Sequence, residues 1–212
     1  MSNKEIKVIT PPNVGWLEYK LNPQEMDYLW RCIETNKKRS FKNNLAGNIS
    51  SSYSLMDRGD WFFTNVCTPL MYEYTERFEN LGKFIPTSMN HPYCMNSWWV
   101  NYQKQNEFNP IHTHGGVYSF VIWMKIPYDS KKQNQKDIAR NSNAPLIGDF
   151  QFLFSTTLGK NSDYTYRLSP QYEGTMLFFP AQLDHQVYPF YDCDEDRISV
   201  SGNIRIDTSK KL

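Results

Sequence analysis

The sequence predicts a mainly β fold, a sandwich or a barrel, preceded by helices. Aromatic side chains make up 16% of the residues, with six Trp and fourteen Tyr, and such large side chains pack well on sheets. Segments with strand-like alternation recur through the second half of the chain and are separated by turn residues. Helix-start signals followed by helical periodicity occur only in the first half.

The length and charge of the chain narrow the class of protein. With 212 residues the chain fits a single domain (1–212), with helical and loop support over 1–92 and a β core over 93–206. The formal net charge of +1 disfavours an extended nucleic-acid footprint. No apolar run is long enough to cross a bilayer, and the N-terminus lacks the apolar core of a secretory signal. We therefore expect an intracellular, cytoplasmic protein.

Two helices are predicted in the first half. Asn22, Pro23 and Glu25 form a helix start, and Met26, Leu29, Trp30 and Ile33 then recur on one face. A second helix starts at Thr68–Pro69, and Gly82 is its expected C-cap. The Asn- and Ser-rich residues 40–64 between them are expected to form a loop. The cysteines are widely spaced, which favours free thiols over a disulfide or zinc framework. They are Cys32, Cys67, Cys94 and Cys193.

Strands are expected from about residue 93 onward. The candidates are Ser97–Gln103, Val117–Ile126, Phe150–Ser155, Tyr164–Leu168, Thr175–Phe179 and Arg197–Ile206. Trp98 and Trp99 should point to opposite faces of their strand; core packing is the favoured interpretation, and a substrate-stacking platform is the alternative. Residues 128–146 contain almost no apolar side chain and predict a long exposed loop.

Three of the four histidines stand where one metal ion could be held. His112 and His114 are two residues apart before a strong strand, so both imidazoles can point to the same side. His185 follows a strand that runs into a Pro-containing turn. Each of them alone is compatible with a surface histidine, but two adjacent ligands and one distant ligand together favour a mononuclear metal site.

A row of polar side chains follows His185. Arg197, Ser199, Ser201 and Asn203 alternate with apolar or small residues and share one face of a strand. If that face points into a barrel, the arginine requires an anion, and a bidentate pair with a carboxylate would fit. The alternative is an exposed edge strand on which Arg197 pairs with a nearby acid. Those acids are Asp194, Glu195 and Asp196.

In this order, these motifs resemble the iron(II)- and 2-oxoglutarate-dependent oxygenases. That pattern has His-x-Asp/Glu, a distal His, and Arg-x-Ser; here it is carried by His112-Thr113-His114, His185 and Arg197-Ile198-Ser199. The context around these residues is similar to a poorly characterised group of the superfamily found among phage and bacterial proteins. The resemblance covers roughly residues 95–206.

The resemblance implies a double-stranded β-helix (jelly roll, cupin-like) with a metal at its open end. Fe(II) would be held by His112, His114 and His185. The 2-oxoglutarate would chelate the metal, and its far carboxylate would be bound by Arg197 and Ser199. Tyr102 or Asn101, on the preceding strand, could add a hydrogen bond. The implied reaction consumes O2, decarboxylates 2-oxoglutarate oxidatively and hydroxylates a prime substrate that the sequence does not identify.

His114 departs from the resemblance, because Asp or Glu is usual at its position. We favour a site in which His114 takes the place of the carboxylate. In a second interpretation His114 is a bystander and a carboxylate comes from elsewhere; the candidates are Glu107, Asp149 and Asp184. In a third, the iron site is degenerate and the protein binds without catalysing.

Two further classes of function remain as alternatives. A cupin-type metalloenzyme would use three histidines without 2-oxoglutarate, but it has no need of the Arg197-x-Ser199 pair. A non-catalytic jelly-roll binding module would hold no metal. We also expect residues 128–146 to act as a substrate-covering lid. The aromatic-rich sheet faces are compatible with a homodimer.

Overall fold

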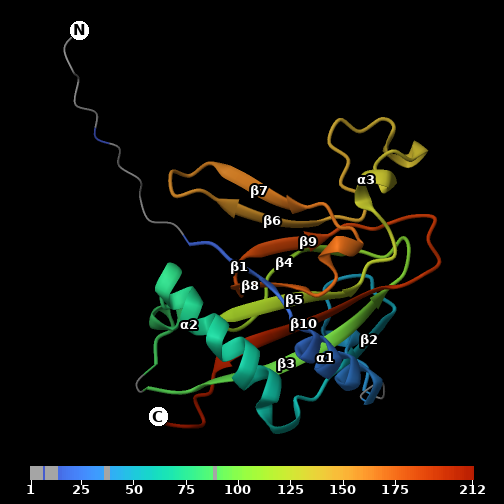
Figure 1. Ribbon diagram of the computed structural model, residues 1–212. Helices are drawn as coiled ribbons and strands as arrows, with labels where there is room; N and C mark the ends of the chain where they lie inside the picture. Colours follow the sequence, from blue (N-terminus) through green and yellow to red (C-terminus); the bar gives the residue numbers. More distant parts are fainter. Residues whose placement is uncertain (1–6, 8–13, 36–38, 88–89) are drawn as a thin grey trace.

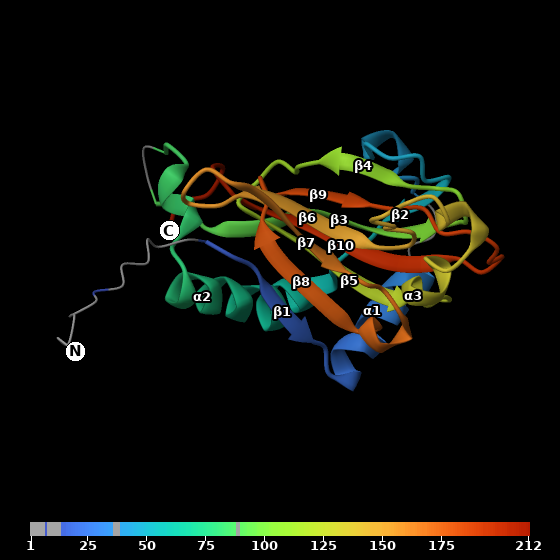
Figure 2. The ribbon, with the colours of Figure 1, turned by 90° about the horizontal axis from the view of Figure 1, so that it is seen from above.

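In the computed structural model, two antiparallel sheets lie face to face, and two helices cover the outer face of the larger sheet (Figures 1 and 2). The structure describes residue 7 and residues 14–35, 39–87 and 90–212. Within these residues the larger sheet has the order β1-β8-β5-β10-β3-β2, and the smaller sheet has the order β4-β9-β6-β7. The larger sheet consists of β1 (Leu17–Lys20), β2 (Ser51–Ser54), β3 (Tyr93–Gln103), β5 (Tyr118–Lys125), β8 (Thr175–Pro180) and β10 (Arg197–Ile206). The smaller sheet consists of β4 (Asn109–His112), β6 (Phe150–Ser155), β7 (Asn161–Tyr166) and β9 (Asp184–Val187).

The first predicted helix start is confirmed. Helix α1 (Pro23–Thr35) begins with a reciprocal cap: the Glu25 backbone N–H donates to Asn22 Oδ1 at 3.0 Å, and the Asn22 backbone N–H donates to Glu25 Oε2 at 2.8 Å. Helix α2 (Thr68–Arg77) continues directly from a π-helical stretch, Phe63–Cys67. Gly82 is not its C-cap, because the helix ends at Arg77 and Gly82 lies in the following 3-10 turn.

The long strands match the expectation, and the differences concern short ones. Strand β3 begins four residues earlier than predicted, at Tyr93, and β7 lies a few residues earlier than its predicted range. Four strands of only four residues each had not been predicted. They are β1, β2, β4 and β9. Three of them lie at a sheet edge, where pairing from one side allows a short strand with little sequence signature.

The core has two parts, one on each face of the larger sheet. Side chains of α1 and α2, such as Leu29 and Tyr74, pack with Trp98 and Phe120 on the outer face. A second cluster fills part of the space between the sheets and includes Trp123 and Phe152. No helix among the described residues is long and apolar enough to span a membrane. All four cysteines are free thiols; Cys32 and Cys67 are buried as expected, whereas Cys94 and Cys193 are only half-buried.

Strands β10 and β3 form the floor of the space between the sheets. They pair in antiparallel register, so that the polar row of β10 lies opposite a row of β3. We call each pair of directly opposed residues a rung. The four rungs are Arg197 with Gln103, Ser199 with Asn101, Ser201 with Trp99, and Asn203 with Ser97. Because alternate side chains share a face, all eight side chains point to the same side. The alternative in which Arg197 lies on an exposed edge strand is therefore wrong, since β10 is central and Arg197 is buried.

Candidate active site

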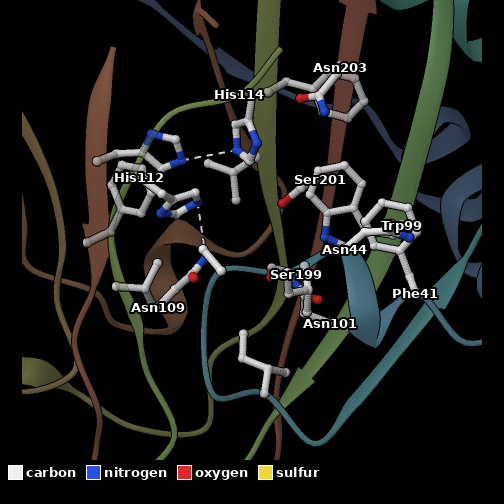
Figure 3. A pocket seen from close by; sticks show the side chains of 18 of the residues that line it. Phe41, Asn44, Trp99, Asn101, Asn109, His112, His114, Ser199, Ser201 and Asn203 are labelled. Carbon is white, nitrogen blue, oxygen red and sulfur yellow. Dashed lines mark hydrogen bonds between the residues drawn. The ribbon is translucent and has the colours of Figure 1, made fainter. Parts of the chain in front are cut away.

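A cavity of about 450 Å³ opens between the two sheets. Its walls include all eight side chains of the four rungs, together with residues of β5, β6 and β9 and the segment between α1 and β2. Figure 3 shows His112, His114 and Asn109 on one side, and Trp99, Asn101 and Ser199 facing them from the other. The polar row on β10 thus faces a cavity, which is one of the two interpretations that the sequence left open.

The three predicted histidines meet in this cavity. His112 at the end of β4 lies directly opposite His185 on β9, and the backbone N–H of His114 is held by the Ala181 carbonyl oxygen at 2.8 Å. One ligating nitrogen from each of the three rings lies within 4.8 Å of the others. The two Nε2 atoms of His114 and His185 are 3.2 Å apart. This arrangement directs three imidazoles at one point.

Backbone carbonyls fix two of the rings in the tautomer that a metal requires. His112 Nδ1 lies 2.7 Å from the Pro110 oxygen, and His185 Nδ1 lies 2.9 Å from the Leu183 oxygen. Because a carbonyl oxygen only accepts hydrogen bonds, each Nδ1 carries the proton. Each ring then presents its Nε2 lone pair to the cluster, where that of His112 accepts from the Asn109 amide nitrogen at 3.1 Å and that of His185 faces His114 Nε2 at 3.2 Å. A metal would take the place of these contacts, and the carbonyls at Nδ1 are the usual outer-shell arrangement around ligating histidines.

The surroundings keep these imidazoles neutral. Burial lowers the pKa of His114 from 6.5 to about 4, with a further contribution from neighbouring His112. Burial likewise lowers the pKa of His112. Burial, followed by the two neighbouring rings, holds the pKa of His185 well below 6.5. Neutral imidazole is the form that binds a metal, so the cluster is competent at neutral pH.

None of the three alternative carboxylates joins the cluster. Glu107 accepts hydrogen bonds from the backbone N–H groups of Ser50 and Lys104. Asp149 is buried and pairs with Arg167 at 2.5 Å, and Asp184 is exposed. In the part of the chain that the structure describes, the only group of potential metal ligands consists of the three histidines. The residues present therefore fit a three-imidazole site.

Arg197 lies in the same cavity and is 3% exposed. Its guanidinium donates to the Tyr128 hydroxyl at 2.5 Å, to the Gly148 carbonyl and to Gln103 Oε1. Burial raises the pKa of Tyr128 to about 12, so this partner is uncharged. Among the described residues, no Asp or Glu forms an ion pair with Arg197. A buried guanidinium with neutral partners alone is suited to receive a carboxylate from a ligand.

The two candidates on β3 fall on opposite sides of the sheet. Asn101 lies opposite Ser199, lines the cavity and is buried. Tyr102 lies on the other face, where it packs against the cluster beneath the helices. Tyr102 therefore does not reach the cavity, because adjacent strand residues point in opposite directions. Gln103, which the sequence analysis did not single out, occupies the rung of Arg197 instead.

The segment that covers the cavity is not the one expected. None of residues 128–146 lines it, and α3 (Ser130–Gln133) and the loop after it project beyond the end of the sheets (Figure 1). Residues 41–49 form part of the wall instead. We call residues 40–50 the strap. Its Phe41 stacks on Trp99, with ring centroids 4.5 Å apart. Its Asn48 forms an isolated antiparallel β-bridge with Phe108, the residue before β4.

Two facing antiparallel sheets enclose a cavity that brings together a candidate metal-binding histidine cluster and a buried arginine suited to a carboxylate, an arrangement typical of jelly-roll metalloproteins. Residues 97–203 match the model of the family described as "Putative 2OG-Fe(II) oxygenase", and the chain belongs to this family. It is therefore an Fe(II)- and 2-oxoglutarate-dependent oxygenase, whose co-substrates are 2-oxoglutarate and O2. No curated protein sequence matches the chain significantly.

Solved structures with the same fold confirm the predicted double-stranded β-helix. The viral collagen prolyl hydroxylase of Paramecium bursaria Chlorella virus-1, solved with 2-oxoglutarate, is 13% identical with a TM-score of 0.50; the match covers 89% of this chain and 94% of that one. A prolyl-4-hydroxylase from Pseudomonas putida is 14% identical with a TM-score of 0.50, covering 91% and 92%. At these identities the likeness shows the fold alone. The family match favours the oxygenase over the cupin and binding-module alternatives.

Proposed function

We propose that His112, His114 and His185 hold the catalytic Fe(II), and that Arg197 binds the far carboxylate of 2-oxoglutarate with Ser199 and Asn101 beside it. The observation that carries this proposal is the presence of both groups in one cavity. Three neutral imidazoles point at one position, and a buried arginine without a carboxylate partner lies on the facing wall of the same cavity.

Some residues would bind the metal and 2-oxoglutarate, and others would orient the side chains that bind them. The Pro110 and Leu183 carbonyls keep two imidazoles in the ligating tautomer. Arg197 offers two N–H groups to a carboxylate, and Gln103 and Tyr128 hold the guanidinium in place. With Fe(II) bound, oxidative decarboxylation of 2-oxoglutarate to succinate and CO2 supplies the oxidising power to hydroxylate a C–H bond.

Anaerobic titration with Fe(II) and 2-oxoglutarate tests these assignments. Chelated 2-oxoglutarate produces a weak visible metal-to-ligand charge-transfer band, so the band reports both groups together. We expect His185→Ala to abolish the band and Arg197→Ala to require far more 2-oxoglutarate to produce it.

The chain offers a matched control for each variant. His91→Ala removes the histidine outside the cluster, and Arg205→Ala removes an exposed arginine on the same strand as Arg197. Neither change should alter the band. An Arg197→Ala protein that binds 2-oxoglutarate as the wild type does would refute the arginine assignment. Iron binding without any band would refute the 2-oxoglutarate site.

A further inference from the structure

The proposed cofactor and co-substrate sites leave half of the cavity floor unused. Counting along β10, Arg197 and Ser199 occupy the first two rungs, and Gln103 and Asn101 face them on β3. The next two rungs are Ser201 with Trp99 and Asn203 with Ser97, and all four side chains line the cavity. These two rungs extend the floor by about 13 Å beyond Ser199, since residues along a strand advance about 3.3 Å each.

These outer rungs adjoin the metal cluster. The ring centroids of Trp99 and His114 are 5.8 Å apart, in an edge-to-face arrangement. Figure 3 shows Ser201 and Asn203 on the side of the cavity that faces His114, with Asn44 of the strap close to Trp99. A group bound against this wall would therefore lie next to a metal ligand, where a prime substrate must be placed to react.

The outer rungs present neutral hydrogen-bond donors. Asn203 Oδ1 already accepts from the Ser119 hydroxyl at 2.8 Å, so its amide nitrogen is directed toward Ser97 and the cavity wall. That nitrogen has two hydrogens, and its contact with Ser97 Oγ is long, at 3.4 Å. Trp99 is 3% exposed, and its indole nitrogen has no hydrogen-bond partner. Hydroxyls of Ser201 and Ser97 add further donors.

Among the described residues that line the cavity, no side chain offers a carboxylate to a cationic substrate group. The lining residues include no Asp, Glu or Lys, and their one permanently charged side chain is Arg197. Under the proposed function that arginine is paired with 2-oxoglutarate. A free ammonium group entering the cavity would lose its hydration without gaining a carboxylate partner, which is costly.

We propose that Ser201, Trp99, Asn203 and Ser97, with Phe41 and Asn44 of the strap, form the prime-substrate subsite, and that it receives an uncharged group with a carbonyl acceptor, of the amide class. The inference rests on the proposed function and adds the chemistry of the substrate. Free, zwitterionic amino acids are excluded by the same argument, whereas the same residues with both ends capped as amides are accepted. The indole nitrogen of Trp99 is itself buried, so a carbonyl that reaches its N–H must displace the atoms that cover it.

The test uses matched pairs of probes on protein loaded with Zn(II) and 2-oxoglutarate, in which no turnover occurs. Each pair consists of a free amino acid with an uncharged side chain and its N-acetyl, N-methylamide derivative. The indole N–H signals of ¹⁵N-Trp-labelled protein are followed by NMR, and Trp99→Phe assigns the signal of Trp99. Capped probes should shift this signal and the free amino acids should not. Equal or tighter binding of the free amino acids, or no shift with any capped probe, would overturn the proposal.

Substitution of two serines on β10 tests the substrate subsite and the 2-oxoglutarate site separately. Ser201→Ala should weaken binding of the capped probe about fivefold, as expected for one lost hydrogen bond, and leave 2-oxoglutarate affinity unchanged. Ser199→Ala should do the reverse. If Ser199→Ala behaves as stated but Ser201→Ala leaves probe binding intact, the substrate subsite is wrong while the oxygenase assignment stands. If neither serine nor Arg197 affects 2-oxoglutarate, the proposed function itself fails.

Discussion

A neutral imidazole at position 114 sets the charge of the proposed metal centre. Three histidines leave the full charge of Fe(II) uncompensated by the protein, whereas a carboxylate would reduce it by one. The carboxylate of 2-oxoglutarate, bound near the metal, then becomes the main compensating charge. Metal binding and 2-oxoglutarate binding are therefore expected to support each other more strongly here than in a site with its own carboxylate.

His114→Glu and His114→Ala test the position directly. A Glu carboxylate reaches about as far from Cβ as imidazole Nε2, so His114→Glu should keep Fe(II) affinity within about tenfold, while His114→Ala should lose at least about a hundredfold. Equilibrium dialysis against Fe(II) under anaerobic conditions measures both. Equal affinity of the Ala variant and the wild type would show that His114 is not a ligand.

The histidine cluster also predicts how the metal-free protein responds to acid. In the unfolded chain each imidazole takes up a proton near pH 6.5, whereas folded His114 stays neutral down to about 4. The unfolded state therefore binds more protons between these values, and the free energy of unfolding should decrease as the pH falls from 6.5 toward 4. For one imidazole the slope is about 1.4 kcal/mol per pH unit.

Urea denaturation of metal-free protein across this range measures the effect. His114→Gln should make the stability less dependent on pH, and His91→Gln serves as the control outside the cluster. An unchanged slope in His114→Gln would contradict the lowered pKa of His114.

At the scale of single residues, the sequence predicts the three candidate ligands better than the residues that surround the proposed sites. His112, His114 and His185 can be found because spacing and order restrict where their side chains go. Choosing between Asn101 and Tyr102 requires knowing which face of β3 points inward, and this depends on the register with Arg197. Gln103 and Tyr128 were missed for the same reason, since no local pattern marks a residue that holds an arginine across two strands.

Among the elements, strand β10 is the one in which both faces restrict the choice of side chain. One face lines the cavity, and the other packs against the core beneath the helices, where Val200 and Ile204 are fully buried. Gly202 lies on this second face. A Cβ atom there would come within 2.5 Å of Phe120 Cζ and 2.9 Å of Trp98 Cβ.

Gly202→Ala should therefore destabilise the protein by about 1–3 kcal/mol, because the surrounding rings must shift to make room. Chemical denaturation measures the loss. Gly115→Ala is the control, since a Cβ at Gly115 meets no atom within 4 Å. Equal stability of the two variants would mean that the packing around β10 is looser than described.

Helices and strands that show a hydrophobic period or a helix cap in their own sequence could be predicted. Strands that form only because they pair with another strand could not. Helix α1 has its Asn22–Glu25 cap and an apolar face in the sequence itself. Strand β4 has only four residues, contains Pro110 and pairs with β9 alone, so nothing local distinguishes it from a loop. Its role follows from tertiary pairing, which places His112 opposite His185.

At the scale of the whole molecule, the strap closes the side of the cavity between the two sheets. It contacts the larger sheet through the Phe41–Trp99 stack and approaches the smaller sheet at Gly47, where a Cβ would lie 2.6 Å from the Phe108 carbonyl oxygen. The polar segment 128–146 was expected to cover the cavity because it is long and polar. The expectation of a long exposed loop holds only in part, because the segment contains α3 and because Tyr128, Ser130, Gln133 and Ala139 are buried. Composition also carried no information about which cavity the segment faces.

Limited proteolysis distinguishes the two segments. Addition of Zn(II) and 2-oxoglutarate should slow cleavage within the strap and leave cleavage within residues 131–146 unchanged, because only the strap lines the cavity. Mapping of the fragments by mass spectrometry identifies the sites. Protection confined to residues 131–146 would restore the lid that the sequence suggested.

The position of the three histidines has a mechanical consequence. His114 and His185 are 71 residues apart in the chain, and β4 is an edge strand matched to β9 only at its two ends. A metal held by all three imidazoles would act as a cross-link that fastens this edge strand to its neighbour, much as a disulfide closes a long loop. Loss of iron and fraying of β4 would then be one event, visible as faster hydrogen exchange there. Hydrogen exchange in α1 and α2, which pack on the outer face of the larger sheet, should stay unchanged.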